Sequence, residues 1–130
     1  MNLNKCFILG RLTREPETRC LPSGTQVCNL GVATDSFSTN KETNEKKQKV
    51  EFHNIVLFSK LAETASKYLH KGGLVLIEGR LSTREWVDAN GLKHYRTEII
   101  ADNMQLGPKT GETDYKKYDD GQGDAEIRPF

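Results

Sequence analysis

Several features that define large protein classes are missing from this 130-residue sequence. Its three cysteines are odd in number and show no CxxC spacing, which argues against a disulfide framework and against a zinc site. No apolar run is long enough to span a membrane, and the N-terminus lacks the apolar stretch of a secretory signal. The three histidines are scattered, and no glycine-rich phosphate loop is present. We therefore expect a cytoplasmic protein with reduced thiols, no membrane partner, no metal and no other cofactor.

A net charge near zero hides an uneven distribution of charge along the chain. Lys and Arg number 19 and Asp and Glu 18, which gives +1. Residues 108–130 hold four basic and six acidic residues and show no apolar periodicity, whereas residues 1–107 carry a basic excess. We expect one domain over residues 1–107, followed by a flexible acidic tail over residues 108–130.

Apolar alternation predicts strands in the body, because successive strand side chains point to opposite faces. The expected strands are residues 6–12, 25–35, 50–58, 74–86 and 93–106. The polar, lysine-rich segment 36–49 is predicted to be a long loop or a flexible hairpin. One helix is predicted over about residues 60–71, with Ser59 as its N-cap and Gly72-Gly73 as its stop. Five strands with a helix between the third and fourth predict an all-β fold, a five-stranded OB-fold barrel.

Two further details of the elements can be read from the sequence. Gly79 predicts a bulge in the fourth strand. Asn90-Gly91 predicts a two-residue type I′ hairpin loop, and counting outward from it pairs Trp86 with Tyr95. The predicted helix places four apolar residues on one stripe, namely Leu61, Ala65, Tyr68 and Leu69.

Aromatic residues on two predicted strands indicate a nucleic-acid ligand. Phe52 and Phe58 alternate onto one face of strand 50–58, and Trp86 follows Arg84 on strand 74–86. Flat aromatic faces beside cations suit stacking on unpaired bases while phosphates are held. Taken alone, a phenylalanine on a strand belongs to the barrel core more often than to a binding surface, so the pattern leaves both roles open for Phe52 and Phe58.

Several segments in one register resemble the family of bacterial single-stranded DNA-binding proteins. The resemblance is carried by residues 29–34, 56–63, 68–72, 77–81 and 83–86. It extends over about residues 3–106 and resumes at the last few residues. It implies an OB-fold, a homotetramer, and sequence-tolerant binding and protection of single-stranded DNA. It also implies a non-enzymatic role in DNA replication, recombination and repair, at the nucleoid in the cytoplasm.

The resemblance implies roles for individual residues. The base-stacking aromatics fall on Phe37, Phe52, Phe58 and Trp86. The phosphate-binding positions fall on Arg19, Lys41, Lys60, Lys71 and Arg84. His53 matches a position near a subunit contact. Phe52 stands where the family commonly has Trp. Asn54 and Glu85 stand where the family commonly has a basic residue, so we expect fewer phosphate contacts here.

The end of the chain resembles the acidic tip through which this family recruits partner enzymes. The matching tip residues are Asp124, Glu126, Ile127, Pro129 and Phe130. An apolar Phe side chain with its own terminal carboxylate suits a basic-rimmed pocket, and nearby acids steer the approach. Arg128 separates Ile127 from Pro129, which departs from the family's Ile-Pro-Phe ending and puts the strength of partner binding in question.

Two other functions fit the sequence less well. A primosome-type OB-fold protein that mainly bridges other proteins would not need the Pro129-Phe130 tip. A small nuclease on an OB-fold would need clustered carboxylates for a metal or a general base. The acidic residues Asp35, Glu51, Glu63 and Glu78 show no such spacing. We therefore predict a binding protein and not an enzyme.

Overall fold

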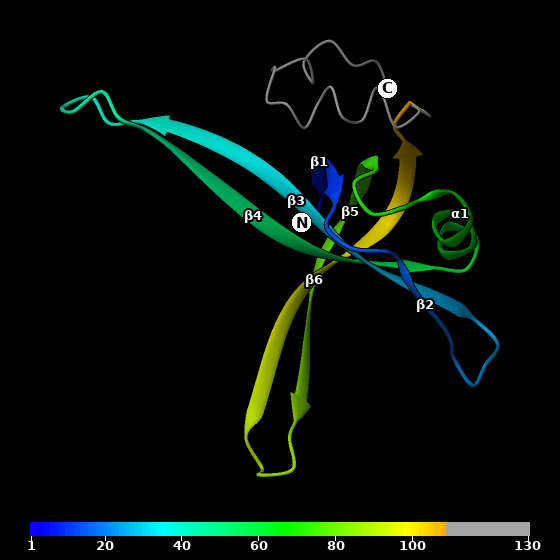
Figure 1. Cartoon of the computed structure of the whole chain (residues 1–130). Helices are drawn as coiled ribbons and strands as arrows, with labels where there is room; N and C mark the ends of the chain where they lie inside the picture. The colour runs from blue at the N-terminus through cyan, green and yellow to red at the C-terminus, as the bar shows by residue number, and fades with distance from the viewer. Residues whose placement is uncertain (109–130) are drawn as a thin grey trace.

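Six strands and one helix follow one another along residues 1–108, the part of the chain that this computed structural model describes (Figure 1). They are β1 (Cys6–Leu12), β2 (Glu17–Cys20), β3 (Gln26–Thr39), β4 (Lys46–Phe58), α1 (Lys60–Tyr68), β5 (Leu74–Val87) and β6 (Lys93–Leu106). The predicted strands 6–12 and 93–106 are confirmed with the same bounds.

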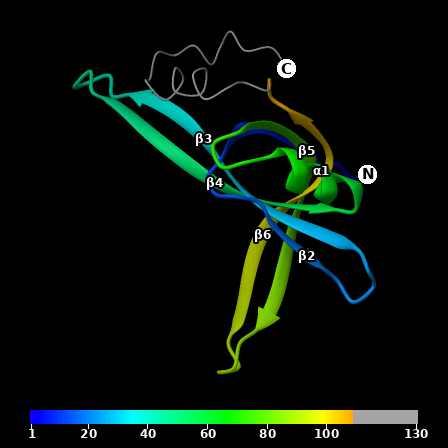
Figure 2. The ribbon, with the colours of Figure 1, turned by 45° about the vertical axis from the view of Figure 1, so that its right-hand side comes forward.

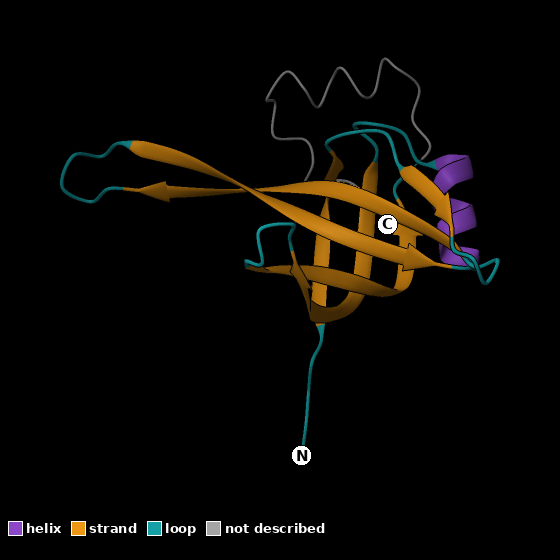
Figure 3. Ribbon diagram, turned by 90° about the horizontal axis from the view of Figure 1, so that it is seen from below, coloured by secondary structure: helices purple, strands orange, loops and turns teal. Residues whose placement is uncertain are grey.

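The strands form one sheet in the order β1-β5-β6-β4-β3-β2, and β1 also pairs with β3. This extra pairing, through Arg11 with Ala33 and Leu12 with Val32, closes the sheet into a barrel (Figure 3). Among the strand pairs within residues 1–108, the short β4–β6 pairing alone is parallel. Five long strands with α1 between β4 and β5 confirm the OB-fold barrel. The short β2 is an addition that apolar alternation did not predict, because all four of its residues are exposed.

The barrel interior is filled by alternate residues of the long strands. From β3 come Cys28, Leu30 and Val32, and from β4 come Ile55 and Leu57, all of them fully buried. Ala62 and Ala65 of α1 belong to the same core. The helix therefore packs directly against the barrel (Figure 2). Since the interior takes the residues of one parity, the residues of the other parity point outward.

Two hairpins extend beyond the barrel in different directions (Figure 1). β3 and β4 pair without interruption from Val27 and Phe58 to Thr39 and Lys46, and we call residues 33–52 the β3–β4 arm. The segment 36–49 is therefore a hairpin, the second of the two predicted alternatives, and only residues 40–45 form its loop. Residues 85–95 form the second projection, which we call the β5–β6 arm.

The predicted loop of the β5–β6 arm was wrong by one residue. The backbone N–H of Asp88 donates to Leu92 O at 3.0 Å, which closes a three-residue loop over residues 89–91. Gly91 has a positive φ of 80° and Asn90 does not, so the type I′ geometry is absent. The Asp88 carboxylate accepts the backbone N–H groups of both Asn90 and Leu92, and this side-chain turn selects the longer loop. As a result Trp86 pairs with His94 and not with Tyr95.

The helix and its ends also differ in part from the prediction. α1 ends at Tyr68 because Leu69 adopts an extended conformation, and the Tyr68 side chain is exposed rather than on the buried stripe. Ser59 precedes the helix with φ 56° and makes no side-chain cap hydrogen bond. The bulge at Gly79 is confirmed by a register shift between Glu78 and Gly79. A Cβ at Gly79 would lie 2.3 Å from the Ile100 carbonyl oxygen, so this close strand approach requires glycine.

Candidate nucleic-acid interface

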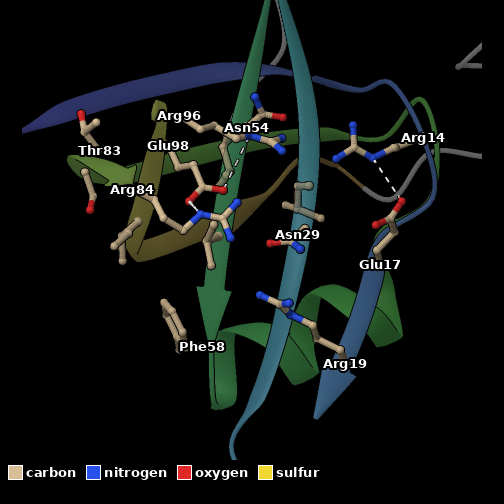
Figure 4. Close-up of a pocket in the computed structure, with 15 residues that line it drawn as sticks. Arg14, Glu17, Arg19, Asn29, Asn54, Phe58, Thr83, Arg84, Arg96 and Glu98 are labelled. Atoms are coloured by element: carbon tan, nitrogen blue, oxygen red, sulfur yellow. Dashed lines mark ion pairs between the residues drawn. The ribbon is translucent and has the colours of Figure 1, made fainter. Parts of the chain in front are cut away.

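A continuous outer face runs across five strands of the barrel. Residues that oppose each other across a strand pair share a face, and the pairs Arg19–Val27 and Val27–Phe58 carry this face from β2 to β4. On the far side of β4 it continues to β6 and β5, where Arg84 opposes Arg96. Side chains from these five strands line a pocket of about 460 Å³ (Figure 4).

The pocket carries a net positive charge. Its charged residues are four arginines and two glutamates, namely Arg14, Arg19, Arg84, Arg96, Glu17 and Glu98. Arg14 pairs with Glu17 at 3.8 Å, whereas Arg19 has no ion-pair partner among residues 1–108. A concave surface with an excess of two positive charges attracts a polyanion.

Phe58 and Trp86 place aromatic rings beside these arginines. Phe58 lines the pocket and is exposed. The Arg84 guanidinium lies 5.2 Å from the centroid of the Trp86 ring, within the range of a cation–π contact. His94 stacks on Trp86 with the ring centroids 5.4 Å apart. The sequence placed Trp86 beside an arginine, and the structure adds an imidazole from the neighbouring strand.

The hydrogen bond between His94 and Asp88 holds the imidazole of this stack. His94 Nε2 lies 2.6 Å from Asp88 Oδ2. This hydrogen bond, and then the backbone N–H of Leu92, lowers the pKa of the Asp88 carboxyl below its ordinary value. The same carboxylate therefore closes the hairpin loop and orients the ring that packs on Trp86.

Phe37 and Phe52 lie on the β3–β4 arm, on the same outer face as Phe58. Phe52 opposes Ala33 and Phe37 opposes Gln48, so both share the strand parity of Phe58. Their side chains are 71% and 70% exposed. The core alternative for Phe52 and Phe58 is therefore excluded, because Ile55 and Leu57 fill the barrel from β4 instead.

The remaining predicted residues lie away from the pocket. Lys41 is in the loop of the β3–β4 arm, Lys60 is the first residue of α1, and Lys71 follows the helix. The backbone N–H of Lys71 donates to the Glu15 carboxylate. His53 Nε2 lies 2.8 Å from Thr34 Oγ1, on the face of β4 opposite to Phe52. The predicted tip, residues 124–130, lies outside the described residues.

Four charged pocket residues were missed by the sequence analysis. Arg14 lies in the loop before β2 and Glu17 is the first residue of β2, a strand that was not predicted. Arg96 and Glu98 belong to β6, and the wrong hairpin register left Arg96 without its true partner, Arg84. A three-residue loop, counted from Asp88, would have brought Arg84 and Arg96 together.

Comparisons with known proteins agree with this geometry. The model of the single-strand binding protein family matches residues 3–107. The chain belongs to this family. Two relatives, the single-stranded DNA-binding proteins of Neisseria meningitidis serogroup A and serogroup B, are each 40% identical to it over 124 residues. The match covers 95% of this chain and 71% of each relative.

Two solved structures of the family have the same fold. The Plasmodium falciparum SSB in complex with ssDNA has a TM-score of 0.73 and 34% identity, over 82% of this chain and 94% of that one. A deletion mutant of the single-stranded DNA binding protein from Thermus aquaticus has a TM-score of 0.71 and 28% identity. That match covers 80% of this chain and 50% of the other.

Membership of the single-strand binding protein family makes single-stranded DNA the ligand class of this chain. It also confirms the predicted family and excludes the nuclease alternative, because the family and its structures are DNA-binding proteins and not enzymes. Within residues 1–108, no helix combines the length and the apolar composition needed to cross a membrane.

Proposed function

We propose that this protein binds and protects single-stranded DNA without reading its sequence, during DNA replication, recombination and repair. The observation that carries the proposal is the shared outer face, on which exposed aromatic rings accompany a net positive pocket. Stacking of a base on an aromatic side chain contributes about 1–3 kcal/mol and tolerates every base, because each base has a π-face.

In this proposal the DNA strand follows the outer face from the β3–β4 arm, through the pocket, to the β5–β6 arm. The stacking platforms are Phe37, Phe52, Phe58 and Trp86. Arg19 and Arg84 hold phosphates in the pocket, and Arg14 and Arg96 add to its positive charge. Lys41, Lys60 and Lys71 are further phosphate contacts outside the pocket. Each phosphate contact adds about −0.7 to the slope of log K against log salt for a single strand.

We also propose that the protein acts as a homotetramer. Phe7 and Leu9 of β1 are exposed on its outer face. β1 pairs with β3 only through Arg11 and Leu12, so the first part of β1 leaves one edge of the strand unpaired. An exposed apolar strand with a free edge is a surface on which a second copy can pair. His53, on the face of β4 opposite to Phe52, is proposed as a further subunit contact. Repeated sites raise the avidity for a long DNA strand.

The acidic tail completes the proposal. Residues Asp124, Glu126, Ile127, Pro129 and Phe130 are proposed to bind replication, recombination and repair enzymes at a basic-rimmed pocket on those partners. The proposed location is the cytoplasm, where the protein associates with the nucleoid.

A fluorescence titration with dT oligonucleotides of several lengths tests the proposal. It is run at two salt concentrations, beside a mass measurement of the free protein and the complex. We expect tight, salt-dependent binding of the single strand, weak competition by duplex DNA, and a mass of four chains. Equal affinity for duplex DNA would contradict the stacking mechanism, and a monomer mass would contradict the tetramer.

A further inference from the structure

Glu98 is a carboxylate inside the pocket that we propose binds phosphates. Only 15% of its side chain is exposed, against 52% for Arg84 and 42% for Arg96. Glu98 Oε1 lies 3.6 Å from Arg84 Nε, and Glu98 Oε2 lies 3.8 Å from Arg96 Nε. Figure 4 shows the carboxylate between the two guanidinium groups. A largely buried carboxylate in a pocket that is proposed to bind phosphates requires an explanation.

The strand register supplies the first part of this explanation. Arg84 and Arg96 are directly opposite each other across the β5–β6 pair. Like charges in opposite positions repel, and each would be destabilised without a counter-charge. Glu98 is two residues from Arg96 on the same face of β6, and it opposes Ser82, the neighbour of Arg84 on the same face of β5. Its carboxylate is therefore placed to neutralise part of this repulsion when no DNA is bound.

The distances supply the second part. Both contacts, made to the Nε atoms, are longer than the 2.7–3.2 Å of a normal N–H···O hydrogen bond, and within residues 1–108 no hydrogen bond joins Glu98 to either guanidinium group. The forked ends of the two guanidinium groups are thus not engaged by Glu98, and this fork is the part that matches a phosphate. The arrangement holds the arginines by charge and leaves their recognition groups available.

We infer that Glu98 is an internal counter-ion: it occupies the charge position between Arg84 and Arg96 that a DNA phosphate takes over in the complex. The inference rests on the proposed function of the pocket. In this role Glu98 positions the two arginines in the free protein and weakens the bound state, because it repels the arriving phosphate. Two arginines and one glutamate present one net positive charge to DNA, and removal of the glutamate raises that to two.

The Glu98→Gln variant tests the inference through salt dependence. One more effective positive charge steepens the slope of log K against log salt by about 0.7. The ratio of Kd at 200 mM salt to Kd at 50 mM salt then rises about 2.6-fold, since the salt range is fourfold. We also expect tighter binding of a dT oligonucleotide at 50 mM salt. Glu98→Thr, a strand-favouring neutral residue, gives the same result where glutamine is not tolerated.

Glu78→Gln is the matched control. Glu78 lies on β5 outside the pocket and pairs with Lys5 at 2.7 Å, so the variant removes the same charge away from the proposed DNA path. We expect its salt slope to stay at the wild-type value. A second comparison uses Arg96→Gln, which leaves Glu98 and Arg84 with no net charge and flattens the slope by about 0.7. Adding Glu98→Gln to it restores one net charge and the wild-type slope.

The outcomes separate the inference from the proposed function. Wild-type protein that fails to bind the dT oligonucleotide overturns the proposed function. Wild-type binding with a weaker Glu98→Gln variant of unchanged slope overturns only the counter-ion role, because it shows that Glu98 merely maintains the structure. An Arg96→Gln slope that Glu98→Gln does not restore overturns it as well.

Discussion

The indole of Trp86 and the imidazole of His94 are stacked, with their planes inclined by only 21°. The two residues are directly opposite each other across β5 and β6, and Asp88 fixes the imidazole from the loop that joins these strands. Arg84 adds a cation over the same indole. His94 and Arg84 thus hold the orientation of Trp86 before DNA arrives, and Asp88 acts through His94. This lowers the entropic cost of binding a base.

Trp86→Ala removes this proposed platform. We expect the variant to bind a labelled dT oligonucleotide about 1–3 kcal/mol more weakly, because one base loses its stacking partner. Fluorescence anisotropy of the labelled DNA measures this without depending on the protein's single tryptophan. Trp86→Phe is the control, since it keeps a π-face and should retain most of the affinity. Unchanged affinity in Trp86→Ala would remove Trp86 from the site.

Asp88→Asn should change how stability depends on pH. The hydrogen bond with His94 and the backbone N–H of Leu92 lower the pKa of the Asp88 carboxyl below its ordinary value of 3.8. Because the pKa is lower in the folded state, the ionised carboxylate stabilises the protein at pH values above the unfolded-state pKa. This contribution is lost as the pH falls through the folded-state pKa. The urea concentration at the unfolding midpoint should differ most between wild type and variant above about pH 5, and this difference should shrink at lower pH. A difference that stays constant with pH would contradict the ionised carboxylate's role.

The sequence was sufficient for the barrel and insufficient for parts of its surface. Apolar alternation identified β1 and β6 because each strand contributes buried residues to the barrel core, such as Leu12 and Ile99. It missed β2 because all residues of that strand are exposed. The alternation of Phe52 and Phe58 was correct, but only the structure shows which side faces the core. The interior belongs to Ile55 and Leu57, a fact that depends on how β3 and β6 flank β4.

The hairpin register shows why part of the site stayed hidden. Asn90-Gly91 is a strong local signal for a two-residue loop, yet the Asp88 carboxylate binds two backbone N–H groups and lengthens the loop to three. The longer loop shifts the register of β5 against β6, so that Trp86 pairs with His94 and Arg84 pairs with Arg96. Arg96 and His94 could therefore enter the site only once a side-chain hydrogen bond was known.

Phe52→Trp should strengthen DNA binding. Phe52 is a smaller π-face than the tryptophan that the family commonly has at this position, and it is 70% exposed, so a larger ring meets no barrel core. We expect about two- to fivefold tighter binding of a dT oligonucleotide, since stacking energy grows with the contact area. Phe52→Ala should weaken binding, and its unfolding temperature should remain near that of wild type. Equal affinities for all three residues would show that DNA does not reach this part of the β3–β4 arm.

Removal of residues 127–130 should separate DNA binding from partner binding. The proposed stacking and phosphate residues all lie within residues 1–108, so we expect the affinity for a dT oligonucleotide to be retained. The truncated protein, loaded on immobilised DNA, should no longer retain replication and repair enzymes that the full chain retains. Deletion of Arg128 alone is the matched control, because it restores the Ile-Pro-Phe ending and should retain these enzymes at least as well as the full chain. Loss of DNA binding on truncation, or equal enzyme retention with and without the tip, would contradict the proposed role of the tail.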